Sequence, residues 1–72
     1  MSEFSAQRLR EARERRHIAR ENLAIKIGRS YATVASYEQG YNVPPIATLC
    51  RIADELDVPI ESFFVEVDEV PA

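Results

Sequence analysis

The chain has 72 residues, enough for one domain with a single modest core. With 46% hydrophobic and 29% charged residues it has the composition of a soluble globular protein. No apolar run reaches the roughly 20 residues that span a bilayer, and the N-terminus lacks the apolar stretch of a signal peptide. We therefore expect a cytoplasmic protein that does not contact a membrane.

The chain holds one cysteine and one histidine, and both numbers restrict its chemistry. Cys50 cannot form an internal disulfide, and we expect it to pack against a helix face. His17 alone cannot anchor a conventional zinc site, and we expect it in a loop. Neither residue has the partners that a catalytic centre needs. The sequence therefore predicts no metal, no cofactor and no enzymatic activity.

Charge is unevenly distributed along the chain. Residues 1–51 contain all nine basic residues and five acidic ones, a net charge of +4, whereas residues 52–72 contain seven acids and no base. The overall charge of −3 argues against a polyanionic partner. A partner responds to the local field, however, and the first 51 residues are basic. DNA therefore remains a candidate partner, and the acidic end would repel phosphate.

Glycines and prolines divide the chain into short segments with helical apolar spacing. These segments predict five helices, over about residues 6–16, 20–27, 31–38, 46–56 and 60–64. Ser5 and Ser30 are suitable N-caps for the first and third helices. Gly28 and Gly40 are suitable C-terminal ends for the second and third helices. Strand signals are otherwise absent, so we expect an all-α fold, a compact five-helix bundle.

The strongest amphipathic signal lies in residues 46–56. Its apolar residues recur at helical spacing: Ile46, Leu49, Ile52, Ala53 and Leu56. The short fifth helix would return the apolar residues of 60–64 to the core. We assign residues 1–64 to the domain and residues 65–72 to an acidic tail. Its alternating run VEVDEV fits a short strand and a frayed end equally well.

Residues 20–38 have the spacing of a helix-turn-helix. Two short helices are joined by the turn Gly28-Arg29-Ser30. Ala24 is small where the helices approach each other, and Gly28 permits the positive φ that the turn requires. Val34 is a β-branched residue placed to fill the crossing. The pattern predicts a motif in which the second helix presents an outward face.

From Arg8 to Phe64 the sequence resembles the XRE/Cro-like (phage-repressor) family. The matching residues are Arg13, Leu23, Ala24, Gly28, Ser30, Thr33, Glu38, Gly40, Pro44, Thr48, Leu49, Ile52, Ala53 and Phe64. The resemblance implies a lambda-repressor-like domain and a sequence-specific, double-stranded DNA-binding transcriptional regulator. It also implies a partly buried ion pair between Arg13 and Glu38. Because no effector-binding domain is recognised, control would come from concentration or from a protein partner.

In that family the second helix of the motif lies in the major groove. Steps of about 100° per residue place one arc toward the protein: Thr33, Val34, Tyr37 and Glu38. The groove-facing set is Tyr31, Ala32, Ala35 and Ser36. Phosphates would be flanked by the start of the preceding helix, the turn and the following loop. The candidate DNA-binding residues are Arg20, Arg29, Ser30, Tyr31, Ala32, Thr33, Ala35, Ser36, Tyr41 and Asn42, with Arg20 and Arg29 assigned to phosphates.

Two features depart from the family pattern. Where the family usually has a polar N-cap followed by glutamine, this chain has Ala19 and Arg20. Residues 31–38 also contain no Arg, Lys, Asn or Gln, the side chains that make strong bidentate contacts with bases. Readout would then depend on groove shape and on weaker contacts. The side chains available for these contacts are Tyr31, Ser36, Ala32 and Ala35.

A domain of this size buries too little DNA surface for high affinity, so we expect a homodimer on two half-sites. The apolar residues available for its interface are Val58, Ile60, Phe63 and Phe64. The weak reading helix and the net acidity leave a second hypothesis open. In it, the fold serves as a protein-interaction module, such as an antitoxin-like or anti-repressor partner, with little DNA specificity.

Overall fold

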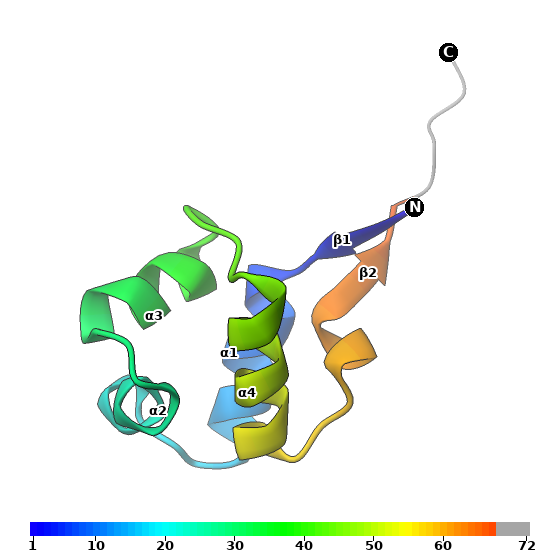
Figure 1. The fold of residues 1–72 in the computed structure, drawn as a ribbon. Coiled ribbons are helices and arrows are strands. Elements are labelled where there is room, and N and C mark those ends of the chain that lie inside the picture. Colours follow the sequence, from blue (N-terminus) through cyan, green and yellow to red (C-terminus); the bar gives the residue numbers. More distant parts are fainter. Residues whose placement is uncertain (68–72) are drawn as a thin grey trace.

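The computed structural model describes residues 1–67, which form four α-helices, a short 3₁₀ helix and a small pair of strands (Figure 1). In chain order the elements are β1 (Ser2–Phe4), α1 (Ala6–Arg15), α2 (Arg20–Ile27), α3 (Tyr31–Gln39), α4 (Ile46–Leu56), the 3₁₀ helix (Ile60–Phe63) and β2 (Phe64–Glu66). The prediction of an all-α, five-helix bundle is therefore wrong in two respects. Its fifth helix is a four-residue 3₁₀ turn, and the fold includes strands.

Side-chain caps define the starts of two helices. Ser5 Oγ accepts a hydrogen bond from the backbone N–H of Arg8 at 3.2 Å, and Ser30 Oγ accepts one from that of Thr33 at 3.1 Å. Both predicted N-caps are thus confirmed. Helix α2 begins after Ala19, which offers no side-chain acceptor to the first turn. Its leading N–H groups consequently have no side-chain cap.

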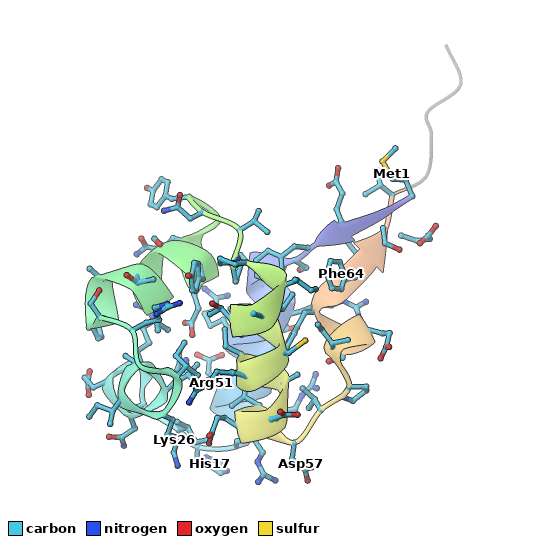
Figure 2. The ribbon with its side chains drawn as sticks, viewed as in Figure 1. Met1, His17, Lys26, Arg51, Asp57 and Phe64 are labelled. Atoms are coloured by element: carbon cyan, nitrogen blue, oxygen red, sulfur yellow. The ribbon has the colours of Figure 1, made fainter. Side chains whose placement is uncertain are left out.

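Left-handed residues follow all four α-helices. The predicted ends at Gly28 and Gly40 are confirmed, with φ of +70° and +82°. His17 and Asp57 adopt the same conformation at φ +55° without being glycine, and both lie at the end of the molecule away from Met1 (Figure 2). A β-carbon in this region costs about 1–2 kcal/mol, although Asp tolerates it better than most residues. His17 therefore ends α1 at a cost in stability.

The core lies where α1, α2, α3 and α4 meet. Helix α2 packs against α3 and α4, and α1 packs against α3. The buried apolar residues are Leu9, Ala12, Leu23, Ala24, Ile27, Val34, Tyr37, Leu49, Ile52, Ala53, Leu56 and Phe63. The predicted inner face of α4 is confirmed except at Ile46, which is exposed because it begins the helix beyond the packed layer. Cys50 is exposed rather than packed, contrary to expectation.

The two ends of the described chain meet in an antiparallel strand pair. The register is Ser2↔Glu66, Glu3↔Val65 and Phe4↔Phe64. The Phe4 and Phe64 rings pack edge to face with their centroids 6.4 Å apart, and Val67 N–H donates to the carbonyl of Met1 at 2.8 Å. Residues 65 and 66, which the sequence assigned to the tail, thus pair with β1. Residues 68–70 of the predicted tail strand lie outside the described residues.

Within residues 1–67, no helix is both long and apolar enough to cross a membrane.

Candidate nucleic-acid interface

Helices α2 and α3 form the predicted helix-turn-helix, with α3 at the edge of the molecule (Figure 1). Ala24 and Val34 are buried where the two helices cross. Gly28 adopts the positive φ that the turn requires. Because α3 packs on α1 and α2 through one side only, its other side is left open.

Burial along α3 agrees in part with the predicted inner and outer arcs. Val34, Tyr37 and Glu38 are buried. Tyr31 and Ala32 are exposed, whereas Thr33, Ala35 and Ser36 are half-buried. The exposed residues of α3 are therefore Tyr31 and Ala32 in its first turn and Gln39 at its C-terminal end. The first turn is the part that touches base edges when such a helix enters the major groove. Contact of these residues with bases stays a prediction.

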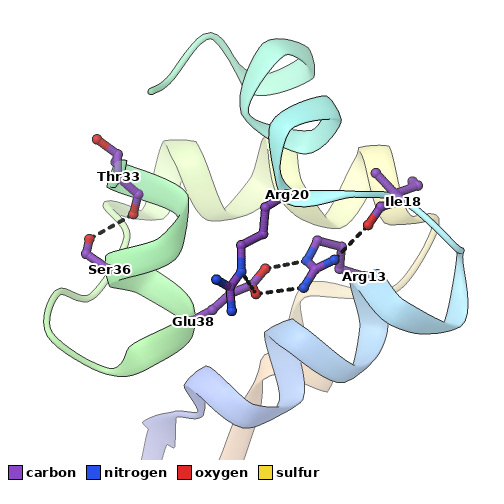
Figure 3. A network of polar contacts seen from close by, with 6 residues as sticks. All are labelled: Arg13, Ile18, Arg20, Thr33, Ser36 and Glu38. Atoms are coloured by element: carbon purple, nitrogen blue, oxygen red, sulfur yellow. Dashed lines mark hydrogen bonds and ion pairs between the residues drawn. The ribbon is translucent and has the colours of Figure 1, made fainter. Parts of the chain in front are cut away.

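The polar side chains beside this first turn are linked to one another. Ser30 Oγ and Thr33 Oγ1 are 2.8 Å apart, and the Ser36 hydroxyl donates to the Thr33 carbonyl at 2.8 Å (Figure 3). Asn42 Nδ2 donates to Ser36 Oγ at 3.2 Å. The Ser36 hydroxyl thus uses its only proton within α3 and one of its two acceptor lone pairs for Asn42, which leaves one lone pair as an acceptor. The sequence did not predict the link between Ser36 and the loop at Asn42.

The expected ion pair between Arg13 and Glu38 is confirmed. Arg13 Nε and Nη2 donate to the two carboxylate oxygens of Glu38 at 2.6 and 2.9 Å, and Arg13 Nη1 donates to the carbonyl of Ile18 at 2.8 Å (Figure 3). The side chain of Glu38 is 0% exposed and that of Arg13 is 10% exposed. This bidentate pair joins α3 to α1 and to the loop before α2.

Arg20 is a second cation on the same carboxylate. Its Nε donates to Glu38 Oε1 at 2.8 Å, and its side chain is 24% exposed. The hydrogen bond to Glu38 raises the pKa of the Arg20 guanidinium, and the neighbouring side chain of Tyr31 raises it further. The sequence assigned Arg20 to phosphate contact and did not predict its link to Glu38. Within residues 1–67, no hydrogen bond forms from its terminal amino groups.

Arg29 and Tyr41 are exposed at the two ends of α3. Arg29 makes only long contacts, to the carbonyl of Gly28 at 3.4 Å and to Thr48 Oγ1 at 3.5 Å. Its guanidinium therefore remains available to an external anion. Tyr41 follows the last turn of α3 in the loop that leads to α4.

The residues proposed for a dimer interface differ in exposure. Val58, Ile60 and Phe64 are half-buried at the edge of the core. Phe63 is fully buried within the domain, so its side chain has no surface to offer a second subunit, and its place in the predicted interface is wrong. The 3₁₀ helix turns Phe63 inward, and β2 starts at the next residue.

A groove of about 510 Å³ lies on another side of the molecule. Its α1 wall includes Arg8, Glu11 and Arg15, and its floor includes Val58 and Val65. At about 100° per residue, the wall residues lie on the opposite side of α1 from the residue that binds Glu38. The groove is thus separate from the outer face of α3.

Comparison with known proteins identifies related regulators. A transcriptional regulator from the ATPase CF(0) region of Rhodospirillum rubrum, itself uncharacterised, is 37% identical over 62 residues. The match covers 86% of this chain and 57% of that protein, so the chain spans little more than half of that relative. The restriction-modification controller protein C.AhdI from Aeromonas hydrophila is 29% identical, with a TM-score of 0.77 over 82% of this chain and 86% of its own.

The biofilm master regulator SinR, solved in complex with DNA, is 25% identical, with a TM-score of 0.75. That match covers 81% of this chain and 94% of the SinR chain. Residues 9–63 also match the sequence profile of the helix-turn-helix family HTH_3. The chain therefore belongs to the HTH_3 family of helix-turn-helix proteins, the XRE/Cro type that its sequence resembles.

Proposed function

We propose that this chain is a DNA-binding transcriptional regulator that reads the major groove with α3. The observation that carries the proposal is the open first turn of α3, held on a helix-turn-helix by the buried contact between Arg13 and Glu38. A rigidly held reading helix is what base recognition requires. The solved complex of the similar protein SinR with DNA supports the same partner for this fold.

Phosphate contacts are assigned to groups that flank this turn. Arg29 has an exposed guanidinium with only long internal contacts. The first turn of α2 follows Ala19 and lacks a side-chain cap, so its N–H groups are open to an anion. Tyr41 and Asn42 extend the contact surface beyond α3. Together these groups would set the register of the protein on the duplex.

The regulator acts as a homodimer in this proposal, as a repressor-type protein on two related half-sites. One domain makes too few contacts for high affinity, and pairing two domains doubles them. The apolar side chains at the edge of the core are the surface proposed for pairing: Val58, Ile60 and Phe64.

The decisive experiment is a DNA-selection assay with the purified protein at low salt, followed by titrations of the selected duplex and of random DNA. Arg29→Ala should weaken binding to both and lower the log–log salt slope by roughly 0.9 for a lost phosphate contact. Tyr31→Ala should reduce the preference for the selected duplex. Arg8→Ala removes the same charge at the separate groove and serves as the matched control.

A second candidate function is favoured by one observation, an exposed apolar surface beside α3. Tyr41, Val43 and Ile46 are 78%, 68% and 66% exposed. Exposed apolar residues that lie together mark protein-interaction sites. In this alternative the fold binds a protein partner, as an antitoxin-like or anti-repressor module. Selection would then recover no preferred sequence, and Arg29→Ala would behave like the parent protein.

A further inference from the structure

Helix α3 lacks the side chains that usually read bases, and a neighbouring residue can supply what is missing. We infer that Arg20, at the start of α2, reads a guanine in the major groove, with Glu38 holding its guanidinium in place. The inference rests on the proposed function and refines it, because Arg20 becomes a specificity residue rather than a phosphate contact.

The geometry of the guanidinium supports this role. Arg20 uses Nε for Glu38, which leaves the two terminal amino groups as a parallel pair of donors. Such a pair matches the O6 and N7 acceptors of guanine, the commonest specific contact in the major groove. Arg20 is the first residue of α2, the helix that packs against α3. The free donors thus belong to the helix-turn-helix, on the helix next to the reading helix.

The support beneath Arg20 is rigid. Glu38 is 0% exposed and is held through both oxygens by Arg13. It therefore cannot follow Arg20 outward, and it fixes the orientation of the planar group. A phosphate can be bound by a mobile charge, but bidentate base recognition requires a fixed fork. The side chain of Arg20 therefore loses its conformational entropy on folding and not on DNA binding.

The net charge of the cluster formed by Arg13, Arg20 and Glu38 also supports a contact of Arg20 with DNA. Two guanidinium groups share one carboxylate, which leaves an excess of one positive charge. Arg13 is almost fully buried and is satisfied by Glu38 and Ile18. The excess therefore resides on Arg20, the more exposed member of the cluster. This position favours an acceptor group on DNA.

The test replaces the guanidinium of Arg20, with its parallel pair of donors, by a side chain of the same charge. Wild-type protein should prefer guanine at one position of each selected half-site by about 5- to 150-fold over other bases. Arg20→Lys should reduce that preference toward equality at this position alone and keep the salt slope. Arg8→Lys, the matched control at the separate groove, should leave that preference unchanged.

Fluorescence anisotropy with the selected duplex and single-base variants provides the measurement, and circular dichroism verifies that each protein is folded. If Arg20→Lys keeps every base preference, or Arg20→Gln weakens all sequences alike with a lower salt slope, the inference is wrong and Arg20 contacts phosphate. A wild-type protein that selects no sequence contradicts the proposed function as well. The two failures are thereby distinguished.

Discussion

Replacing Glu38 with alanine removes the carboxylate that joins three parts of the domain. Glu38 lies on α3, and its two cationic partners lie on α1 and at the start of α2. The substitution deletes three charge-assisted hydrogen bonds, of 2.6, 2.9 and 2.8 Å. It also leaves Arg13, 10% exposed, with the Ile18 carbonyl as its remaining partner. An almost buried guanidinium is then left without a counter-charge.

Breaking a buried pair in this way costs about 3–5 kcal/mol. For a chain of this length the whole free energy of unfolding is only about 4–11 kcal/mol, so we expect Glu38→Ala to be close to unfolding. The melting temperature should fall by about 12 °C or more, since about 1 kcal/mol corresponds to 4–8 °C in a small domain. Arg20→Ala should cost about 1 kcal/mol or less, because Arg20 is a quarter exposed and Arg13 remains paired.

Urea denaturation followed by circular dichroism measures these differences, with a double-mutant cycle for Arg13 and Glu38. The matched control is Glu55→Ala, which breaks a solvent-exposed pair with Lys26 at 3.8 Å. That substitution should change stability by less than about 1 kcal/mol. A Glu38→Ala protein as stable as the Glu55→Ala protein, with no coupling in the cycle, would refute the reasoning.

Three further predictions concern other parts of the fold. His17→Gly should raise the free energy of unfolding by about 0.5–1 kcal/mol, because glycine relieves the left-handed strain at φ +55°. A melting temperature lower than that of the wild-type protein would contradict this. Phe63→Ala should cost about 3–5 kcal/mol and Phe64→Ala clearly less, since only Phe63 is fully buried. The Met1 ammonium, with a serine hydroxyl, lowers the pKa of Glu66. Glu66 therefore stabilises the strand pair fully above the usual pKa of a Glu carboxyl, and this stabilisation is lost as pH falls through the lowered pKa. An NMR titration of the Glu66 side chain would detect the lowered pKa.

Local signals were sufficient to predict the helical scaffold. Apolar spacing and capping residues such as Ser30 and Gly28 act within a few residues, so they are visible in the sequence. Strand β1 has only three residues, too few for an alternating pattern to be recognised. It forms because Phe64 and its neighbours lie beside it in the folded chain. The choice between Phe63 and Phe64 as the core residue likewise depends on where the 3₁₀ helix ends.

The candidate site was predictable only in part, for a similar reason. The exposed and buried arcs of α3 follow from helical geometry. The contact of Arg13 with Glu38 was expected from the family resemblance. No local pattern could reveal it, because the two residues are 25 positions apart. The contact of Arg20 with Glu38 is a consequence of packing, and Arg20 departs from the family pattern. No local signal marks one carboxylate as shared by two arginines.

In the proposed function, the start of α2, the turn and the first half of α3 bind DNA. Chemical-shift mapping of isotope-labelled protein, titrated with its selected duplex, tests this claim most directly. We predict the largest amide shifts in residues 20–22, 28–36 and 41–42, with the Nε resonance of Arg20 also shifted. Shifts confined to the groove between α1 and β2, or no shifts at low salt, would contradict the claim.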